Sequence, residues 1–273
     1  MRSVTGIISV ACLVMMATAT VNAGTVIAYD LRGDKELLSF PANAPVDNVI
    51  AGPLVESIFA MDFNNLATTL YGITYTGTTA MNLGTIDTTT GAFTTIAPAT
   101  GFLAGETNVV GMSMDPTTET MYAATGSYLY QLNLTTGVVS NAVPFTGNVG
   151  GEMFIDIAIS AGGQMYAHDI VTDALYSVDK TTGSATQLGS TGYLANYAQG
   201  MDFDYETDTL YATIYTGGGT GAFASFNLIT GAATAIVDTT PWNKEMEMAV
   251  AYPIPEPASL ILLALAGLAL RRR

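Results

Sequence analysis

Asp87-Thr88-Thr89-Thr90-Gly91 is the first of four copies of an Asp/Asn-x-x-x-Gly pattern, and this pattern decides the fold. The other copies begin at Asn133, Asp179 and Asn227, so the four glycines are spaced 46, 46 and 48 residues apart. An Asp or Asn caps its own turn, and a glycine with positive φ lets the flanking strands pair. Each copy therefore predicts a hairpin, and the spacing predicts a structural repeat.

Two further strands are predicted upstream of each hairpin. First strands follow the pattern of Met61-Asp62-Phe63-Asn64, and second strands contain a pair such as Leu70-Tyr71. The other copies are Met112–Asp115 with Met121-Tyr122, Ile157–Ser160 with Met165-Tyr166, and Met201–Asp204 with Leu210-Tyr211. Four short strands in roughly every 40–50 residues are typical of a β-propeller blade.

The two ends of the repeat region predict a shared blade. Thr25–Asp30 and Glu36–Phe40 resemble the third and fourth strands of a blade, and Met248–Tyr252 resembles a first strand. No second strand is evident between them. Joining the ends would close the ring and remove most exposed sheet edges. We therefore predict an all-β propeller over residues 24–252 with five four-stranded blades, and six blades as the alternative.

Residues 1–23 are typical of an export signal. A basic start is followed by the apolar run Ile7–Ala19 and by Val21-Asn22-Ala23, which fits the small-x-small cleavage pattern. The only cysteine, Cys12, lies in this segment. A mature chain beginning near Gly24 would therefore contain neither a disulfide nor a thiolate metal site.

The charge balance excludes one class of partner. Of the 23 carboxylates only Glu256 lies outside residues 24–255, which hold just four basic side chains, so this segment has a net charge of −18. Such a surface repels nucleic acid, because phosphate binding depends on lysine and arginine.

Residues 253–273 have three parts in a specific order. Pro255-Glu256-Pro257 is followed by the uncharged run Ala258–Leu270 and then by Arg271, Arg272 and Arg273. As a helix, the run would span about 20 Å, short of the roughly 30 Å hydrocarbon core of a bilayer. The order resembles the PEP-CTERM sorting signal of Gram-negative bacteria. An uncleaved short membrane helix is the alternative.

That resemblance implies a route and a set of partners. In that family the tail makes transient contact with the inner membrane and is cleaved there by an exosortase. The protein is then released to the outer surface or the extracellular matrix. Many hosts of the family make exopolysaccharide, so exopolysaccharide or surface glycans are expected partners.

Few residues suit catalysis or metal binding. His168 is the only histidine and is predicted to lie, exposed, in a loop leaving a second strand. A zinc site would need several histidines or thiolates. The acidic stretch Asp202–Asp208 resembles a calcium loop, but Thr207 and Thr213 stand where an EF-hand requires glycine and glutamate. We therefore expect no cofactor, with calcium as a weaker alternative.

Glutamates and aromatic residues recur in the connections that enter the predicted first strands. In a propeller these connections gather on one face around the channel mouth, and aromatic rings beside acceptors suit sugars or peptides. The alternative is that they wedge the blades together. The candidate ligand face consists of Glu106, Glu152, His168, Tyr193, Tyr197, Trp242 and Glu245.

The sequence thus favours a non-enzymatic binding or scaffold protein. One alternative is an exported carbohydrate-active lyase or hydrolase that uses carboxylates on the channel face. Another is a cation-dependent structural module. A close, buried pair of carboxylates would favour catalysis, whereas clustered aromatic residues without such a pair would favour binding.

Overall fold

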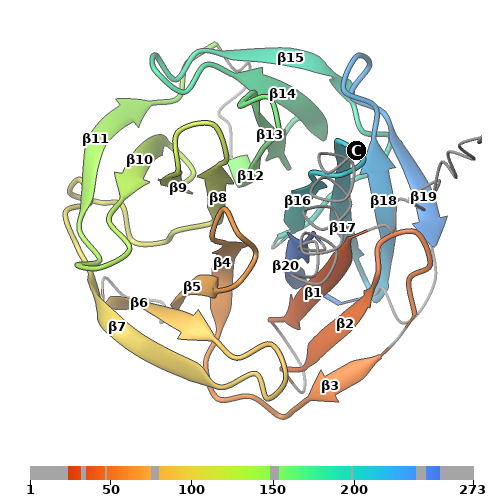
Figure 1. Ribbon diagram of the computed structural model, residues 1–273. Coiled ribbons are helices and arrows are strands. Elements are labelled where there is room, and N and C mark those ends of the chain that lie inside the picture. The colour runs from red at the N-terminus through yellow and green to blue at the C-terminus, as the bar shows by residue number, and fades with distance from the viewer. Residues whose placement is uncertain are drawn as a thin grey trace, which may run out of the picture.

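The computed structural model describes residues 24–31, 35–46, 48–74, 80–147, 154–197, 199–237 and 244–252. These residues form a five-bladed β-propeller of four-stranded antiparallel sheets around a central axis (Figure 1). The prediction of five blades is confirmed. Within the described ranges, no helix is long and apolar enough to cross a bilayer. The predicted leader and the predicted sorting tail both lie outside these ranges.

Blades 1 to 4 each run outward from the axis in chain order. Blade 1 contains β4 (Ile58–Phe63), β5 (Leu70–Thr74), β6 (Met81–Ile86) and β7 (Phe93–Ala99). Blade 2 contains β8 (Gly111–Asp115), β9 (Thr120–Ala124), β10 (Tyr128–Leu132) and β11 (Val139–Pro144). Blade 3 contains β12 (Phe154–Ile159), β13 (Met165–Asp169), β14 (Ala174–Val178) and β15 (Ala185–Ser190). Blade 4 contains β16 (Gly200–Asp204), β17 (Thr209–Gly217), β18 (Thr220–Phe226) and β19 (Ala233–Val237).

Blade 5 joins the two ends of the propeller in the order β20-β1-β2-β3. Its strands are β20 (Met246–Ala251), β1 (Thr25–Asp30), β2 (Leu37–Pro41) and β3 (Val49–Ala51). The predicted closure is confirmed, but the predicted strand order within this blade is wrong. Thr25–Asp30 is the second strand because it pairs along its whole length with β20, from Thr25 opposite Ala251 to Asp30 opposite Met246. The fourth strand is β3, which has only three half-buried or exposed residues and is too short for the alternating pattern that identifies a strand in a sequence.

The core consists of five apolar seams between adjacent blades. The first strands β4, β8, β12, β16 and β20 pack against one another in a ring around the axis. Five hydrophobic clusters fill the wedges outside this ring, and each contains side chains from two neighbouring blades. Because a fully buried large apolar side chain contributes roughly 1.5–3 kcal/mol, these seams hold the blades together.

The propeller has two faces, which the strand directions define. The turn face holds the turns between first and second strands and between third and fourth strands. The connection face holds the links from each fourth strand to the next first strand. The outer turns contain Gly91, Gly137, Gly183 and Gly231, whose φ values are 69°, 71°, 72° and 75°. The predicted positive φ of all four glycines is confirmed.

Both ends of the described propeller lie on the turn face. β20 runs from the connection face to the turn face, and β1 runs back beside it, with Thr25 opposite Ala251. The Gly24 N–H donates to Asp204 Oδ2 at 3.1 Å, next to the axis. The described chain therefore begins and ends on the same face of the ring.

Candidate functional site

Each of the five first strands carries one buried polar side chain that accepts a backbone N–H from the next blade. We call these five residues the polar ring. The acceptors and the residues that donate to them are Asp62 with Met114 (2.6 Å), Ser113 with Ile159 (3.0 Å), Asp156 with Met201 (2.5 Å), Asp202 with Val250 (2.7 Å) and Glu247 with Met61. Every seam thus has one polar contact at the axis.

The three aspartates of the ring are satisfied on both carboxyl oxygens. Asp62, Asp156 and Asp202 each accept the N–H of the residue that follows them, at 2.6–2.7 Å. Each aspartate therefore ties its own strand to the first strand of the next blade through backbone N–H groups.

The ring residues occupy two levels along the axis. Asp62, Ser113 and Asp202 stand opposite a tyrosine of their own second strands. Asp156 and Glu247 lie two residues earlier in their strands than the residues aligned with Asp62 in the repeat. The two earlier positions belong to blades 3 and 5. The inner strands of these blades must therefore approach the inner strands of blades 2 and 4 closely.

Two glycines allow this close approach. A Cβ at Gly111 in blade 2 would lie 2.5 Å from Asp156 Oδ1, and one at Gly200 in blade 4 would lie 2.3 Å from the Met248 nitrogen. Both distances are too short for non-bonded atoms. Glycine at these positions therefore lets the inner strands of blades 3 and 5 approach closely enough to form their ring contacts.

Burial makes the ring carboxyls weak acids. Loss of solvent raises the pKa of Asp62, Asp156 and Glu247 well above the ordinary value, and negative neighbours in the ring raise it further. Burial likewise raises the pKa of Asp202 to about 7, and Asp202 is hydrogen-bonded to Asp62. Asp202 is therefore partly protonated at neutral pH, and Asp62 and Asp202 form a close, buried carboxyl pair.

Tyr205 closes the turn-face end of the axis. It follows β16 in blade 4, yet its hydroxyl donates to the carbonyl oxygen of Met114 in blade 2 at 2.9 Å. Its ring lies against that of Tyr252, with centroids 5.2 Å apart. Burial and the nearby Asp62 and Asp202 raise the pKa of Tyr205, so its hydroxyl stays protonated. Sequence reasoning missed this tyrosine, because no local pattern distinguishes it from other turn residues.

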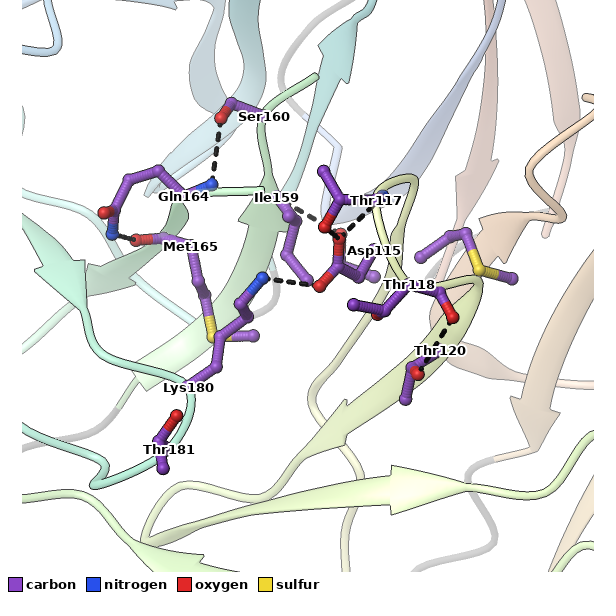
Figure 2. A network of polar contacts seen from close by, with 12 residues as sticks. Asp115, Thr117, Thr118, Thr120, Ile159, Ser160, Gln164, Met165, Lys180 and Thr181 are labelled. Carbon is purple, nitrogen blue, oxygen red and sulfur yellow. Dashed lines mark hydrogen bonds and ion pairs between the residues drawn. The ribbon is translucent and has the colours of Figure 1, made fainter. Parts of the chain in front are cut away.

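A second polar network seals the seam between blades 2 and 3 on the turn face (Figure 2). Asp115, at the end of β8, accepts the N–H of Thr117 at 2.9 Å and its hydroxyl at 2.7 Å. Lys180 reaches from the outer turn of blade 3 and bonds the other Asp115 oxygen at 2.5 Å. Burial raises the pKa of Asp115, but the bonds from Lys180 and Thr117 outweigh it and hold the pKa below the ordinary value.

Three residues of the candidate ligand face lie in connections between blades. Glu106 is half-buried in the link before β8. Tyr193 and Tyr197 lie in the link before β16, where Tyr193 packs against the cluster of blades 3 and 4 and Tyr197 is 59% exposed. The structure therefore places all three on the connection face, in two different links. Glu152 and Trp242 lie outside the described residues, as do Pro255, Glu256, Pro257, Arg271, Arg272 and Arg273.

The predicted exposure of His168 is wrong. His168 lies within β13, which continues to Asp169, and its side chain is fully buried with its ring centroid 5.5 Å from that of Phe226. Burial lowers the pKa of His168 to about 4. Neither ring nitrogen has a hydrogen-bond partner among the described residues. Glu245 is buried beside β1, where its carbonyl oxygen accepts the Leu31 N–H at 2.8 Å.

The acidic stretch Asp202–Asp208 does not converge on one point. Asp202 belongs to the polar ring, whereas Asp204 bonds the Gly24 N–H and the Thr207 hydroxyl. Across the described ranges, no group of three or more histidine, cysteine or acidic side chains is arranged to hold a metal ion. The stretch therefore ends β16 and forms the turn that leads into β17.

Comparisons with solved structures show the fold. A chain from a crystal structure of a nidogen/laminin complex is 13% identical, with a TM-score of 0.52, covering 84% of this chain and 98% of that one. A structural genomics protein of unknown function from Bacteroides thetaiotaomicron is 17% identical, with a TM-score of 0.51, covering 86% of this chain and 62% of that one. At these identities the likeness extends to the fold alone.

The family comparison concerns the C-terminal segment. No curated protein is similar enough in sequence to count as a match. The family model described as the PEP-CTERM protein-sorting motif matches residues 253–273. This is the segment in which the order of the Pro-Glu-Pro motif, the apolar run and the arginines predicted such a signal. The chain is therefore a five-bladed β-propeller protein with a C-terminal PEP-CTERM sorting motif, an exported exosortase substrate of Gram-negative bacteria.

Proposed function

We propose that the protein is a non-enzymatic binding or scaffold module at the outer surface or in the extracellular matrix, where it binds exopolysaccharide or surface glycans. One observation carries this proposal. A propeller enzyme would be expected to place its catalytic acids at the centre of the ring. Here the acidic side chains at the centre are at most 5% exposed, and they accept backbone N–H groups from neighbouring blades. Their use is structural, because a bound N–H occupies the oxygen that catalysis would need.

The connection face supports the binding role. Tyr197 is largely exposed there, and Glu106 and Tyr193 are half-buried in its links. Glu152 and Trp242 remain predicted members of this face. With a net charge of −18 over residues 24–255, the protein favours neutral sugars over anionic ones. Aromatic side chains suit neutral sugars because a ring can pack on the apolar face of a pyranose.

Catalysis on carbohydrate is the second candidate, and the Asp62–Asp202 pair is what favours it. A carboxyl with a pKa of about 7 beside a second carboxyl resembles the acid of a glycosidase. Tyr205, however, closes the turn-face end of the axis above this pair. Substrate would have to displace backbone hydrogen bonds to reach either oxygen.

A single set of assays tests both candidates. Protein recovered from the native host is incubated with polysaccharide purified from the same cultures, and sedimentation measures binding while reducing-end and unsaturated-product assays measure cleavage. We expect binding without product release, and we expect Tyr197→Ala to weaken binding. Ile229→Ala, at an exposed apolar position in the outer turn of blade 4, serves as the matched control. Product release that Asp202→Asn abolishes would instead establish an enzyme, and absence of binding would remove the proposed role.

A further inference from the structure

In three blades, the residue after the outer-turn Asp or Asn reaches back to the preceding blade. Leu134 packs against the apolar cluster that blades 1 and 2 share, and Leu228 packs against the cluster of blades 3 and 4. Lys180 instead bonds Asp115 of blade 2 and lies 6.0 Å from the ring centroid of Tyr122. At these three seams a long side chain therefore covers the turn-face end of the cluster.

The seam between blades 5 and 1 differs because the equivalent residue is Thr88. A threonine is too short to cover the cluster, and a groove of about 520 Å³ remains on the turn face. Pockets of roughly 300–1,000 Å³ are usual for small ligands. Thr88 lines this groove, which lies at the one outer turn where the residue after the Asp or Asn is short.

The lining of this groove has two chemical parts. Its floor is the turn-face end of the apolar cluster, where Ile27, Phe63, Leu70 and Ile86 line the groove and are each at most 5% exposed. Its walls carry the hydroxyl groups of Thr25, Ser39, Thr68, Thr69, Thr88 and Thr89. Asp87 stands at the rim, and hydrogen bonds from Thr89 and Thr90 lower its pKa to about 2, so it is ionised. The residues that line the groove include no lysine or arginine, so an anion has no counter-charge there.

We propose that this groove, the closure-seam groove, is a subsite for one neutral sugar residue of a polysaccharide. A pyranose has an apolar face that matches the floor and a rim of hydroxyls that match the threonine walls. The ionised Asp87 carboxylate accepts sugar hydroxyls and repels uronic or sulfated sugars. This inference rests on the proposed glycan-binding function and assigns it a second site, on the face opposite the connection links.

Thr88→Leu tests the groove by inserting the side chain that Leu134 and Leu228 provide at other seams. The probes are glucose, galactose, mannose, N-acetylglucosamine and their β-linked tetrasaccharides, with glucuronic acid as the anionic comparison. Saturation-transfer NMR and methyl chemical shifts of the threonines report binding. We expect at least one neutral probe to bind wild-type protein, with the Thr88 and Thr25 methyl shifts perturbed, and Thr88→Leu to bind it about tenfold more weakly or not at all.

Two further variants separate the possible causes. Thr135→Leu makes the same change in the blade 2 turn, away from this seam, and is expected to bind like wild type. Thr88→Val keeps the side-chain volume but removes the hydroxyl, so an intermediate affinity is expected if that hydroxyl bonds the sugar. Because the residue lies in a surface turn, thermal unfolding of each variant checks that the fold is kept.

The outcomes distinguish this inference from the proposed function. If native polysaccharide and neutral probes bind wild type and Thr88→Leu equally, the closure-seam groove is not a sugar site, while the glycan-binding role stands. If the perturbed methyls lie only on the connection face, the subsite is likewise overturned. If neither polysaccharide nor any probe binds wild type, both proposals fall together.

Discussion

His168 illustrates how one buried polar residue weakens a seam. Its imidazole is enclosed between blades 3 and 4, and neither nitrogen has a partner in the described part of the chain. A buried donor without an acceptor costs about 1–3 kcal/mol. The expectation of an exposed loop failed because a histidine near the end of a strand gives no local signal of burial. Only the tertiary packing against Phe226 reveals it.

We expect His168→Leu to raise the free energy of unfolding by about 1–3 kcal/mol, because it keeps the volume and removes the unsatisfied donor. Chemical denaturation at pH 7.5 measures the change. His168→Asn is the control, because it retains a buried polar group in a smaller side chain and should lower stability. A His168→Leu protein less stable than wild type would show that the imidazole is satisfied in solution.

The pH dependence of stability should combine two opposite effects. The pKa of His168 is lowered to about 4 in the folded protein, so the stability it contributes is complete above about 6.5 and is lost as pH falls through 4. The pKa of Asp202 is raised to about 7, so its contribution is complete below about 3.9 and is lost as pH rises through 7. Each shift corresponds to about 3–4 kcal/mol as an upper bound.

Single substitutions can separate these two effects in denaturation curves recorded from pH 3.5 to pH 8. Asp202→Asn should remove part of the decline in the free energy of unfolding between pH 4 and pH 7. It should leave unchanged the loss of stability at acid pH that His168 causes. His168→Leu should do the reverse, flattening the loss of stability below pH 6.5. Identical pH profiles for Asp202→Asn and wild type would show that Asp202 does not take up a proton on folding.

At the scale of the element, the outer turns were predictable because their chemistry is local. The Asp or Asn side chain bonds the N–H groups two and three residues later in the same turn, as Asn133 does at 2.9 and 3.0 Å. The glycine then adopts positive φ. Sequence alone contains all of these interactions, so the four hairpins and the blade alignment could be predicted from it.

Other elements depend on distant partners and could not be predicted. β1 is a second strand only because β20, more than two hundred residues later in the chain, pairs with it. The polar ring left one usable signal, the aspartate in the Met-Asp-Phe pattern of β4 and β16. In blade 2 the equivalent residue is Ser113, and in blades 3 and 5 the acidic residue lies two positions earlier in the strand. The polar ring can therefore be recognised only from the hydrogen bonds between blades.

Gly137→Val tests the hairpin chemistry. The φ of 71° is strained for a β-branched residue, and a Cβ would lie 2.4 Å from the Pro98 oxygen of blade 1. Backbone strain alone costs about 1–3 kcal/mol, and the clash with Pro98 should add to that loss. Gly105→Val is the matched control, because Gly105 has φ of 97° and nothing within 4 Å of its Cβ position. Denaturation should show the larger loss for Gly137→Val, and equal losses would exclude a contribution from the clash.

At the scale of the whole molecule, processing at both ends determines what remains of the chain. We expect the mature protein to begin near Gly24 and to end near Pro255–Pro257, because the export pattern and the sorting motif place cleavage there. Intact-mass spectrometry of protein from the native host measures both ends. A mature fraction that still carries Arg271, Arg272 and Arg273 would contradict exosortase cleavage.

The pairing of Thr25 with Ala251 has a mechanical consequence. The chain leaves β1 and β20 at the same end of their ladder, so tension between the two termini pulls that ladder apart one hydrogen bond at a time. An antiparallel pair loaded in this way opens at low force, whereas a pair loaded lengthwise must lose all its bonds together. A molecule pulled through both ends of the propeller would therefore open at blade 5. A molecule held through one end alone carries no load across this ladder, so drag from moving fluid does not act on the closure of the ring.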